Sequence, residues 1–158
     1  NVLSAQKSFI KIAKDNNIEV DVLISKKLND VKNSTHIVLP GQGAFSTCMN
    51  GLKKTDGLID ELCEFALIKK KPFLGICVGM QMLANMSEEN GVHEGLGWID
   101  GQIKLLPGDN LKLPHMGWNL AVPTNSKYNN LISNKNDYYF VHSYYFDCAN
   151  KDLSLIHI

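Results

Sequence analysis

Residues 71–81, KPFLGICVGMQ, constrain the fold of this chain more than any other segment. The apolar pattern predicts a short buried strand over 72–76 and a helix over 78–86, with Cys77 at the corner between them. The corner reads Gly-x-Cys-x-Gly, which is typical of a nucleophile elbow, a strained strand-to-helix turn that exposes a reactive side chain and needs glycine for clearance. The alternative, a buried structural cysteine at the end of a core strand, leaves both glycines unexplained.

The predicted helix after Cys77 supplies the electrostatics that a thiol nucleophile needs. Its first backbone N–H groups and its partial positive charge would point at the corner, which favours a thiolate over a thiol. In an elbow, the backbone N–H of the next residue, Val78, would donate to a developing oxyanion. Gln81 lies one helical turn after Cys77, so its amide faces the same side as the nucleophile. A plain helix-surface glutamine is the alternative for Gln81.

Apolar periodicity alternates between helix and strand along the first 97 residues. It predicts a helix over Val2–Asp15, strands over 18–24 and 36–39, and a further helix with Asp56 as its N-cap. From residue 97 onward the pattern changes to short strands separated by turns: 99–106, 116–122 and 138–144. Alternating elements of this kind predict an α/β fold, with a mainly parallel sheet that has helices on both faces and an antiparallel excursion after residue 97.

Composition is that of an ordinary globular domain and excludes several functions. The 158 residues are about one domain long, and 16 basic against 16 acidic residues give no net charge to attract nucleic acid or an anionic membrane. No apolar run has the length of a membrane span, and no signal-peptide pattern opens the chain. The four cysteines form no Cys-x-x-Cys pair, so neither a metal site nor a cofactor is predicted. A reactive thiol belongs in a reducing compartment, so we expect a cytoplasmic protein.

The elbow run resembles the nucleophile segment of class I (triad) glutamine amidotransferases, whose cysteine takes the γ-glutamyl group of glutamine and releases ammonia. Three other blocks resemble, in order and spacing, the glutaminase subunits of imidazole glycerol phosphate synthases: LPGQGAF at 39–45, LPHMGWN at 113–119 and YFVHSYY at 139–145. The segment HEGLGW at 93–98 also fits, and the similarity runs over essentially the whole chain. The resemblance implies a single glutamine amidotransferase domain over residues 1–158, with the flavodoxin-like fold of that class.

The resemblance also assigns roles to residues outside the elbow. Gly43 would supply a second oxyanion donor, although an ordinary Pro-Gly turn after a strand is the alternative. Gln81 would contact the substrate. Ser143 and Tyr144 would hold the α-amino and carboxylate ends of L-glutamine, partly through their backbone. His142 would be the histidine of this block and not the catalytic base, since a strand-end histidine is more often structural.

A second set of residues would face a partner protein in the resembled family. Asn1, Trp118, Asn119 and Tyr139 would lie against a (β/α)8 cyclase subunit in a heterodimer, around the passage that carries ammonia to the synthesis of imidazole glycerol phosphate in histidine biosynthesis. Exposed tryptophan and tyrosine beside glycine are typical interface anchors. Core packing of Trp118 is the alternative, because tryptophan is highly buried on average.

The two ends of the sequence differ from the family pattern. The family opens with a strand and a Gly-Asn turn and closes with a His-Pro-Glu motif that carries the catalytic histidine and glutamate. We therefore expect an incomplete domain that lacks the first strand and the His-Pro-Glu segment, with little activity for the chain as printed. Three alternatives stay open: a complete but divergent protein with another base, the same chemistry serving another synthase such as a sugar amidotransferase, and a catalytically inactive binding module.

Overall fold

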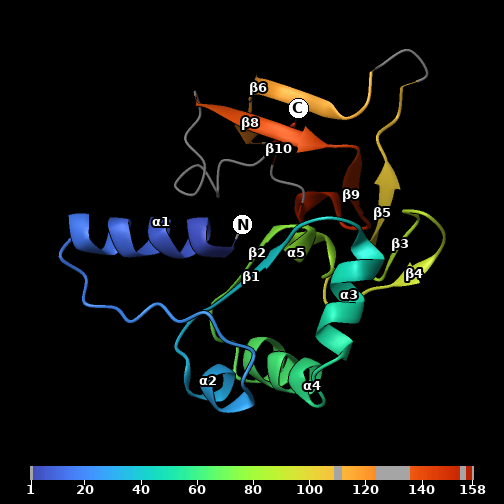
Figure 1. The fold of residues 1–158 in the computed structure, drawn as a ribbon. Helices are drawn as coiled ribbons and strands as arrows, with labels where there is room; N and C mark the ends of the chain where they lie inside the picture. The colour runs from blue at the N-terminus through green and yellow to red at the C-terminus, as the bar shows by residue number, and fades with distance from the viewer. Residues whose placement is uncertain (1, 109–111, 124–135, 154–155, 158) are drawn as a thin grey trace. The chain divides into compact units, whose positions relative to one another are not determined.

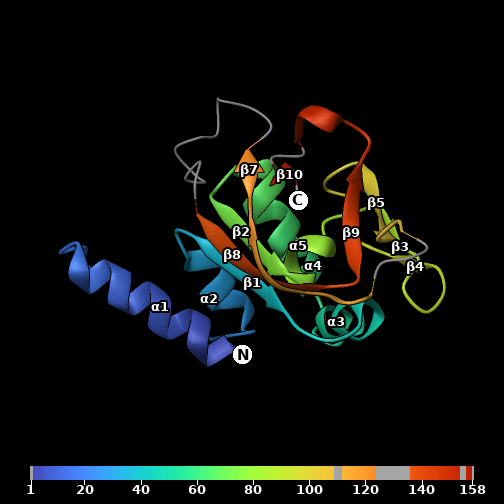
Figure 2. The same ribbon diagram turned by 90° about the horizontal axis from the view of Figure 1, so that it is seen from above.

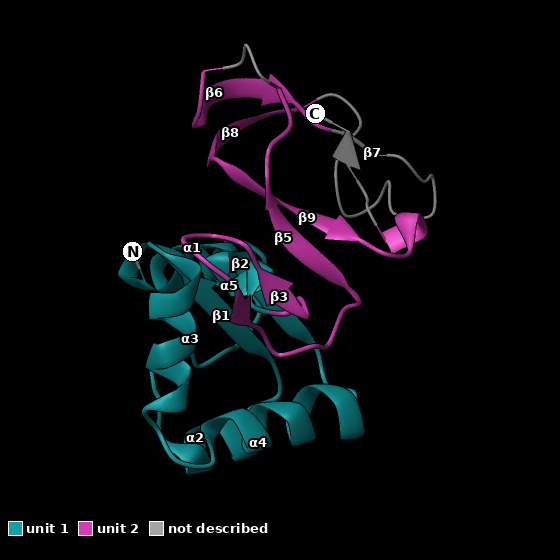
Figure 3. Cartoon of the chain, turned by 90° about the vertical axis from the view of Figure 1, so that its right-hand side faces the viewer, with its two compact units in different colours: residues 1–82 teal, residues 83–158 magenta. Residues whose placement is uncertain are grey.

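A computed structural model describes residues 2–108, 112–123, 136–153 and 156–157 (Figure 1). The chain divides into two compact units, Asn1–Met82 and Leu83–Ile158, which are coloured separately in Figure 3 and are described one at a time. Of the helices in these described ranges, none combines the length and the apolar character that crossing a membrane requires.

The first unit is built from helices and two parallel strands. Its elements are, in chain order, α1 (Val2–Asp15), α2 (Leu28–Asn33), β1 (Ile37–Gly41), α3 (Phe45–Lys53), α4 (Leu58–Cys63), the π-helical turn η1 (Glu64–Ile68), β2 (Phe73–Cys77) and α5 (Val78–Gln81). Strands β1 and β2 run side by side (Figure 2), with Ile37 opposite Phe73 at one end and Gly41 opposite Cys77 at the other. Parallel strands have their carboxyl ends at the same edge, so the turn after β1 and the corner after β2 are neighbours.

A small apolar core holds the helices of the first unit together. Phe45, the first residue of α3, and Phe65 of η1 are fully buried. Helices α3 and α4 bury four more apolar side chains: Met49, Leu52, Leu58 and Leu62. Because α3 begins two residues after Gly43, the burial of Phe45 anchors the loop that follows β1.

The second unit consists mainly of short antiparallel strands. Its elements are β3 (Met86–Ser87), β4 (His93–Glu94), β5 (Gly101–Leu105), β6 (His115–Leu120), β7 (Val122–Pro123), β8 (Asp137–His142), β9 (Tyr144–Cys148), the 3-10 turn η3 (Lys151–Leu153) and β10 (Ile156–His157). Among the described strands, one sheet has the order β4-β3-β5-β9, and two-stranded sheets pair β6 with β8 and β7 with β10. All of these pairs are antiparallel except β3 with β5. The antiparallel excursion predicted after residue 97 is confirmed.

Several predicted elements are also confirmed, and others are wrong. The helix Val2–Asp15 has the predicted bounds. The strand predicted over 18–24 is instead irregular, and among the described residues it pairs with no strand. The alternating pattern there shows only that the segment could be a strand, because a strand also needs a neighbouring backbone to bond. Two hydrogen bonds connect this segment to α1: the Gln6 side-chain amide donates to the Val22 carbonyl oxygen at 2.7 Å, and the Ile18 N–H donates to the Ala13 carbonyl oxygen at 2.8 Å.

Two helix boundaries also differ from prediction. The N-cap before α4 is Gly57 and not Asp56, since the chain enters the helix with φ 74° and no side-chain cap bond. Helix α5 ends at Gln81, well short of residue 86. In a helix that continued to residue 86, the Asn85 N–H would donate to the Gln81 carbonyl oxygen. It donates instead to the Gly101 carbonyl oxygen at 3.1 Å, which leads the chain into β3.

The strand expected to be buried before Cys77 is only partly covered. Leu74 and Ile76 of β2 are exposed, whereas Phe73 and Gly75 are half-buried. In the described residues β2 pairs with β1 alone, so these two strands do not form the broad covered sheet that would bury every side chain.

Candidate active site

The corner at Cys77 has the backbone geometry of a strained turn. Cys77 is the last residue of β2 and precedes α5, with φ 55° and ψ −122°. A positive φ in a residue other than glycine costs about 1–3 kcal/mol and persists only where the surroundings enforce it. The Cys77 side chain is exposed. Strain together with exposure is what a nucleophile elbow requires.

The glycines around Cys77 are required by close backbone contacts. A Cβ on Gly79 would collide with the carbonyl oxygen of Leu39 in β1. A Cβ on Gly75 would lie 2.5 Å from the Cα of Met80, and one on Gly41 would lie 2.5 Å from the backbone nitrogen of Gly79. Strands β1 and β2 and helix α5 therefore meet backbone to backbone. This contact holds the first turn of α5 against the end of β1.

The loop after β1 carries Gly43, which has φ 94° and open space where a side chain would be. The neighbouring carbonyl oxygen of Gln42 accepts a hydrogen bond from the Cys48 thiol, with Sγ and O 3.4 Å apart. In a trans peptide the N–H points opposite to the C=O, so this bond directs the Gly43 N–H away from Cys48. The Cys48 thiol thus fixes the peptide that contains the candidate oxyanion donor.

Val78 and Gln81 lie on α5, which is only four residues long. A helix this short has a small macrodipole, so its effect on Cys77 comes from the individual N–H groups of its first turn. Val78 is buried, and as the first helical residue its N–H has no partner within the helix. Gln81 is half-buried, one turn further on. The structure thus gathers Gly43, Cys77, Val78 and Gln81 at one edge of the β1–β2 pair.

Ser143 and Tyr144 belong to the second unit, at the bend between β8 and β9. The carbonyl oxygen of Ser143 accepts a hydrogen bond from the Leu106 N–H at 2.8 Å. The carbonyl oxygen of Tyr144 lies 3.0 Å from Nδ1 of His142. Both carbonyl groups of this dipeptide are therefore held within the second unit itself.

The β6–β8 ladder arranges the predicted partner residues on two faces. Trp118 and Tyr139 are directly opposite each other, with ring centroids 5.6 Å apart and an interplanar angle of 78°. They are 72% and 55% exposed, so Trp118 is not packed in a core of the described chain. Asn119 is adjacent to Trp118 and therefore points to the opposite face of the ladder. Asn1 lies outside the described residues.

Comparison with known proteins identifies the group to which the chain belongs. A sequence model of the glutamine amidotransferase class-I family matches residues 2–158. The chain belongs to this family. The α/β fold class predicted from the sequence is therefore confirmed.

Similar sequences within this amidotransferase family share one description. The imidazole glycerol phosphate synthase subunit HisH of Pelagibacter ubique is 43% identical over 149 residues, which cover 92% of this chain and 70% of that protein. The HisH subunit of Rhodospirillum rubrum is 41% identical over 155 residues, covering 95% and 72%. HisH 1 of Campylobacter jejuni strain 81-176 is 42% identical over 156 residues, covering 98% and 74%.

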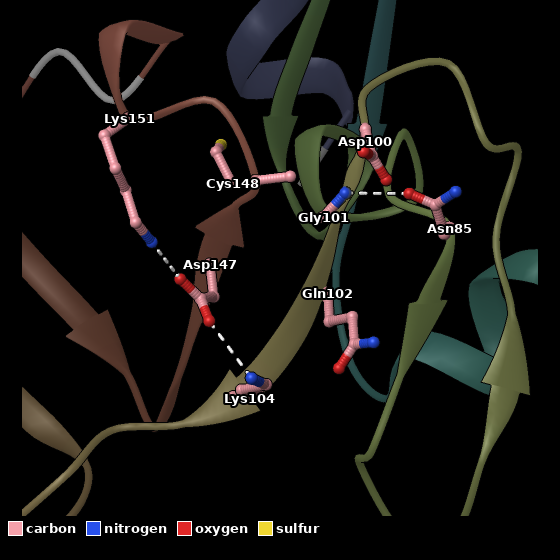
Figure 4. Close-up of a pocket in the computed structure, with 9 residues that line it drawn as sticks. Asn85, Asp100, Gly101, Gln102, Lys104, Asp147, Cys148 and Lys151 are labelled. Carbon is pink, nitrogen blue, oxygen red and sulfur yellow. Dashed lines mark hydrogen bonds and ion pairs between the residues drawn. The ribbon is translucent and has the colours of Figure 1, made fainter.

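A cavity of about 350 Å³ in the second unit is separate from the predicted site residues (Figure 4). Asp147 lies between two lysines there, 3.0 Å from Lys104 Nζ and 2.6 Å from Lys151 Nζ. Hydrogen bonds from Lys151 and then Lys104 hold the pKa of Asp147 below its usual value, and the bonds to Asp147 raise the pKa of both lysines. On the other side, Asn85 Oδ1 accepts the Gly101 N–H at 2.8 Å. Asp147, its two lysines and Asn85 are thus bound to groups within the second unit itself.

Two residues of interest were missed by sequence reasoning. Cys48 could have been found, because side chains in the first turn of a helix point back toward the preceding loop, here the loop with Gly43. His115 could not, since its neighbour His142 is distant in sequence and the pairing depends on the register of β6 and β8.

Proposed function

We propose that this protein is the glutaminase subunit of an imidazole glycerol phosphate synthase, which hydrolyses L-glutamine to glutamate and ammonia and passes the ammonia to a synthase partner in histidine biosynthesis. The observation that carries the proposal is the exposed Cys77 thiol at a positive-φ corner, with the loop of Gly43 beside it. The descriptions of the HisH relatives support the choice of synthase. A reactive thiol is consistent with the cytoplasm, where cysteines stay reduced.

In the proposed mechanism the Cys77 thiolate attacks the side-chain carbonyl carbon of glutamine. The resulting oxyanion would accept hydrogen bonds from the N–H groups of Val78 and Gly43, and each such donor contributes about 3 kcal/mol to transition-state stabilisation. A general base takes the thiol proton and returns it to the leaving nitrogen, so ammonia departs and a thioester remains. Water then hydrolyses the thioester. No His-Pro-Glu motif occurs in the printed sequence, so we assign the base to no residue here.

Three residues that the resemblance assigns to the substrate would orient it. Gln81 would contact the side-chain amide end of glutamine, while Ser143 and Tyr144 would bind its α-amino and carboxylate groups. These roles follow from the resemblance to the family, and the half-buried position of Gln81 on α5 is compatible with a substrate contact.

The partner would be a (β/α)8 cyclase subunit that binds the exposed apolar face of the β6–β8 ladder. Side chains alternate along a strand, so this face combines alternate residues of β6 and β8: Met116, Trp118, Leu120, Tyr139 and Val141. Contiguous exposed aromatic and aliphatic side chains are typical of protein interfaces. Asn119 points to the opposite face of the ladder, so its proposed contact with the partner rests on the resemblance alone. Asn1 is a proposed contact outside the described residues. A sealed interface between the two proteins would keep ammonia away from bulk water, where it would be protonated.

A glutamine analogue with a reactive ketone group tests the catalytic proposal. The protein is expressed as its gene encodes it and is treated with the analogue, and the modified residue is located by peptide mass mapping. We expect the analogue to modify Cys77, because this thiol is exposed at the elbow. Cys148 is half-buried, and burial raises the pKa of its thiol, so it should react slowly. The matched variants Cys77→Ala and Cys148→Ala should abolish and preserve labelling, respectively. An adduct on another cysteine would overturn the nucleophile assignment.

A further inference from the structure

The loop between β1 and α3 is held at both of its ends. At the β1 end, a Cβ on Gly41 would lie 2.5 Å from the backbone nitrogen of Gly79, so the end of the strand packs directly against α5. At the α3 end, the Phe45 side chain is fully buried. These contacts fix the path of the chain, but the rotation of the peptide between Gln42 and Gly43 is a separate degree of freedom.

The peptide between Gln42 and Gly43 has room to rotate. Gly43 has φ 94°, and a Cβ on it would meet nothing within 4 Å. Glycine adopts positive and negative φ about equally readily, so Gly43 itself does little to fix the plane of the peptide that precedes it. The orientation of that plane decides where the Gly43 N–H points.

Cys48 binds this loop twice from the first turn of α3. Its backbone N–H donates to the Ala44 carbonyl oxygen at 3.1 Å, which is an ordinary helical bond. Its half-buried thiol donates to the Gln42 carbonyl oxygen, with Sγ and O 3.4 Å apart. The C=O of one residue and the N–H of the next belong to the same planar peptide. The thiol that holds the Gln42 C=O therefore also holds the Gly43 N–H.

We propose that Cys48 is a positioning residue for glutamine hydrolysis, because its thiol keeps the Gly43 N–H in one orientation. This inference rests on the proposed function, since that function makes the Gly43 N–H a donor to the oxyanion. The peptide lies just after Gly41, which is opposite Cys77 in the β1–β2 pair, so all of these groups belong to the first unit. Cys48 acts through the Gly43 peptide and takes no part in the bond changes at Cys77.

The kinetic consequence follows from when the oxyanion forms. Negative charge develops on the substrate oxygen only as Cys77 attacks, so an oriented Gly43 N–H stabilises the transition state more than it stabilises bound glutamine. Loss of the thiol bond would let the peptide adopt other orientations and should lower kcat while leaving KM almost unchanged. A thiol is a weak donor, so the loss should be smaller than that of removing the oxyanion donor itself.

Glutamine turnover tests this role in the protein as its gene encodes it, assembled with its synthase partner. Cys48→Ala removes the thiol, whereas Cys48→Ser keeps a donor in the same turn of α3. Cys63→Ala is the matched control, because Cys63 is also a half-buried thiol in a helix of the first unit. The kcat and KM for L-glutamine are measured from the glutamate released. Alkylation of Cys77 by iodoacetamide, which forms no oxyanion, reports in parallel whether the elbow is intact.

We expect Cys48→Ala to lower kcat about fivefold, the effect of losing one hydrogen bond, with KM and the iodoacetamide rate unchanged. Cys48→Ser should recover most of this loss, and Cys63→Ala should retain the original kcat. An unchanged kcat in Cys48→Ala, no recovery in Cys48→Ser, or an equal loss in Cys63→Ala would overturn the role of Cys48. A parallel fall in the iodoacetamide rate would also overturn it, because the thiol would then support the elbow as a whole. Absence of glutamine turnover in the unsubstituted complex would instead overturn the proposed function.

Discussion

Gly79 is the position where one added methyl group tests the geometry of the elbow most directly. A Cβ there would collide with the Leu39 carbonyl oxygen and would lie 3.1 Å from the carbonyl carbon of Pro40. These are backbone atoms of β1, which cannot rotate aside as a side chain can, so Gly79→Ala must displace α5 from β1. Overpacking costs about 1–3 kcal/mol, and because both partners are backbone we expect the upper end, about 3 kcal/mol of unfolding free energy.

Gly51→Ala provides the matched control for Gly79→Ala. Gly51 lies within α3, and a Cβ on it would meet nothing within 4 Å. Alanine is favoured over glycine inside a helix by about 0.5–1 kcal/mol, so this variant should be slightly more stable. Urea denaturation of the gene-encoded protein measures both changes, and iodoacetamide modification of Cys77 reports the state of the elbow.

The two variants should therefore change stability in opposite directions, and only Gly79→Ala should alter the rate at which Cys77 is modified. A denaturation midpoint and a Cys77 rate that are unchanged in Gly79→Ala would refute the argument. They would mean that α5 is not seated on β1, and that the glycine pattern around the cysteine has another cause.

Two further predictions concern the second unit. Trp118→Ala should reduce the stimulation of glutamine turnover by the synthase partner at least tenfold, as expected for an interface anchor, while the thermal midpoint of the free protein changes little because the ring is exposed; a large drop in midpoint with unchanged stimulation would contradict the docking role. Because its pKa is lowered, the ion pairs of Asp147 stabilise the fold at a pH above 3.8, the ordinary pKa of the group, and this stabilisation is lost as the pH falls through the lowered pKa. Because the pKa values of Lys104 and Lys151 are raised, their contribution to stability is present below pH 10.5 and is lost as the pH rises through the raised values. Urea midpoints measured from about pH 2 to pH 7 should therefore show a small acid-side loss, limited by solvent screening, that is missing in Asp147→Asn.

The elbow could be predicted from the sequence because its causes are local. A turn that has positive φ at a non-glycine residue and packs against a neighbouring strand needs glycine beside it. Gly75 and Gly79 on either side of Cys77 therefore indicate such a turn in the sequence itself. Helix α1 was predicted for the same reason, since its apolar repeat is contained within fourteen residues. Structure that is determined by nearby residues can therefore be predicted from a short stretch of sequence.

The features that could not be predicted depend on distant parts of the chain. The end of α5 depends on β5, because the Asn85 N–H that a longer helix would donate to the Gln81 carbonyl oxygen donates to Gly101 instead. The irregular segment 18–24 has a strand-like pattern, but among the described residues no backbone pairs with it.

The β6–β8 ladder explains how neighbouring residues can serve two different purposes. Trp118 and Tyr139 point to one face, whereas His115 and His142 point to the other. A shift of β6 by one residue would exchange its faces, placing Trp118 on the face where His142 binds the Tyr144 carbonyl oxygen and His115 on the proposed docking surface. The cross-strand ring contact on one face and the histidine hydrogen bond on the other both require the observed register. A change that weakens one of these pairs should therefore also loosen the other, because both depend on the register of a single two-stranded ladder.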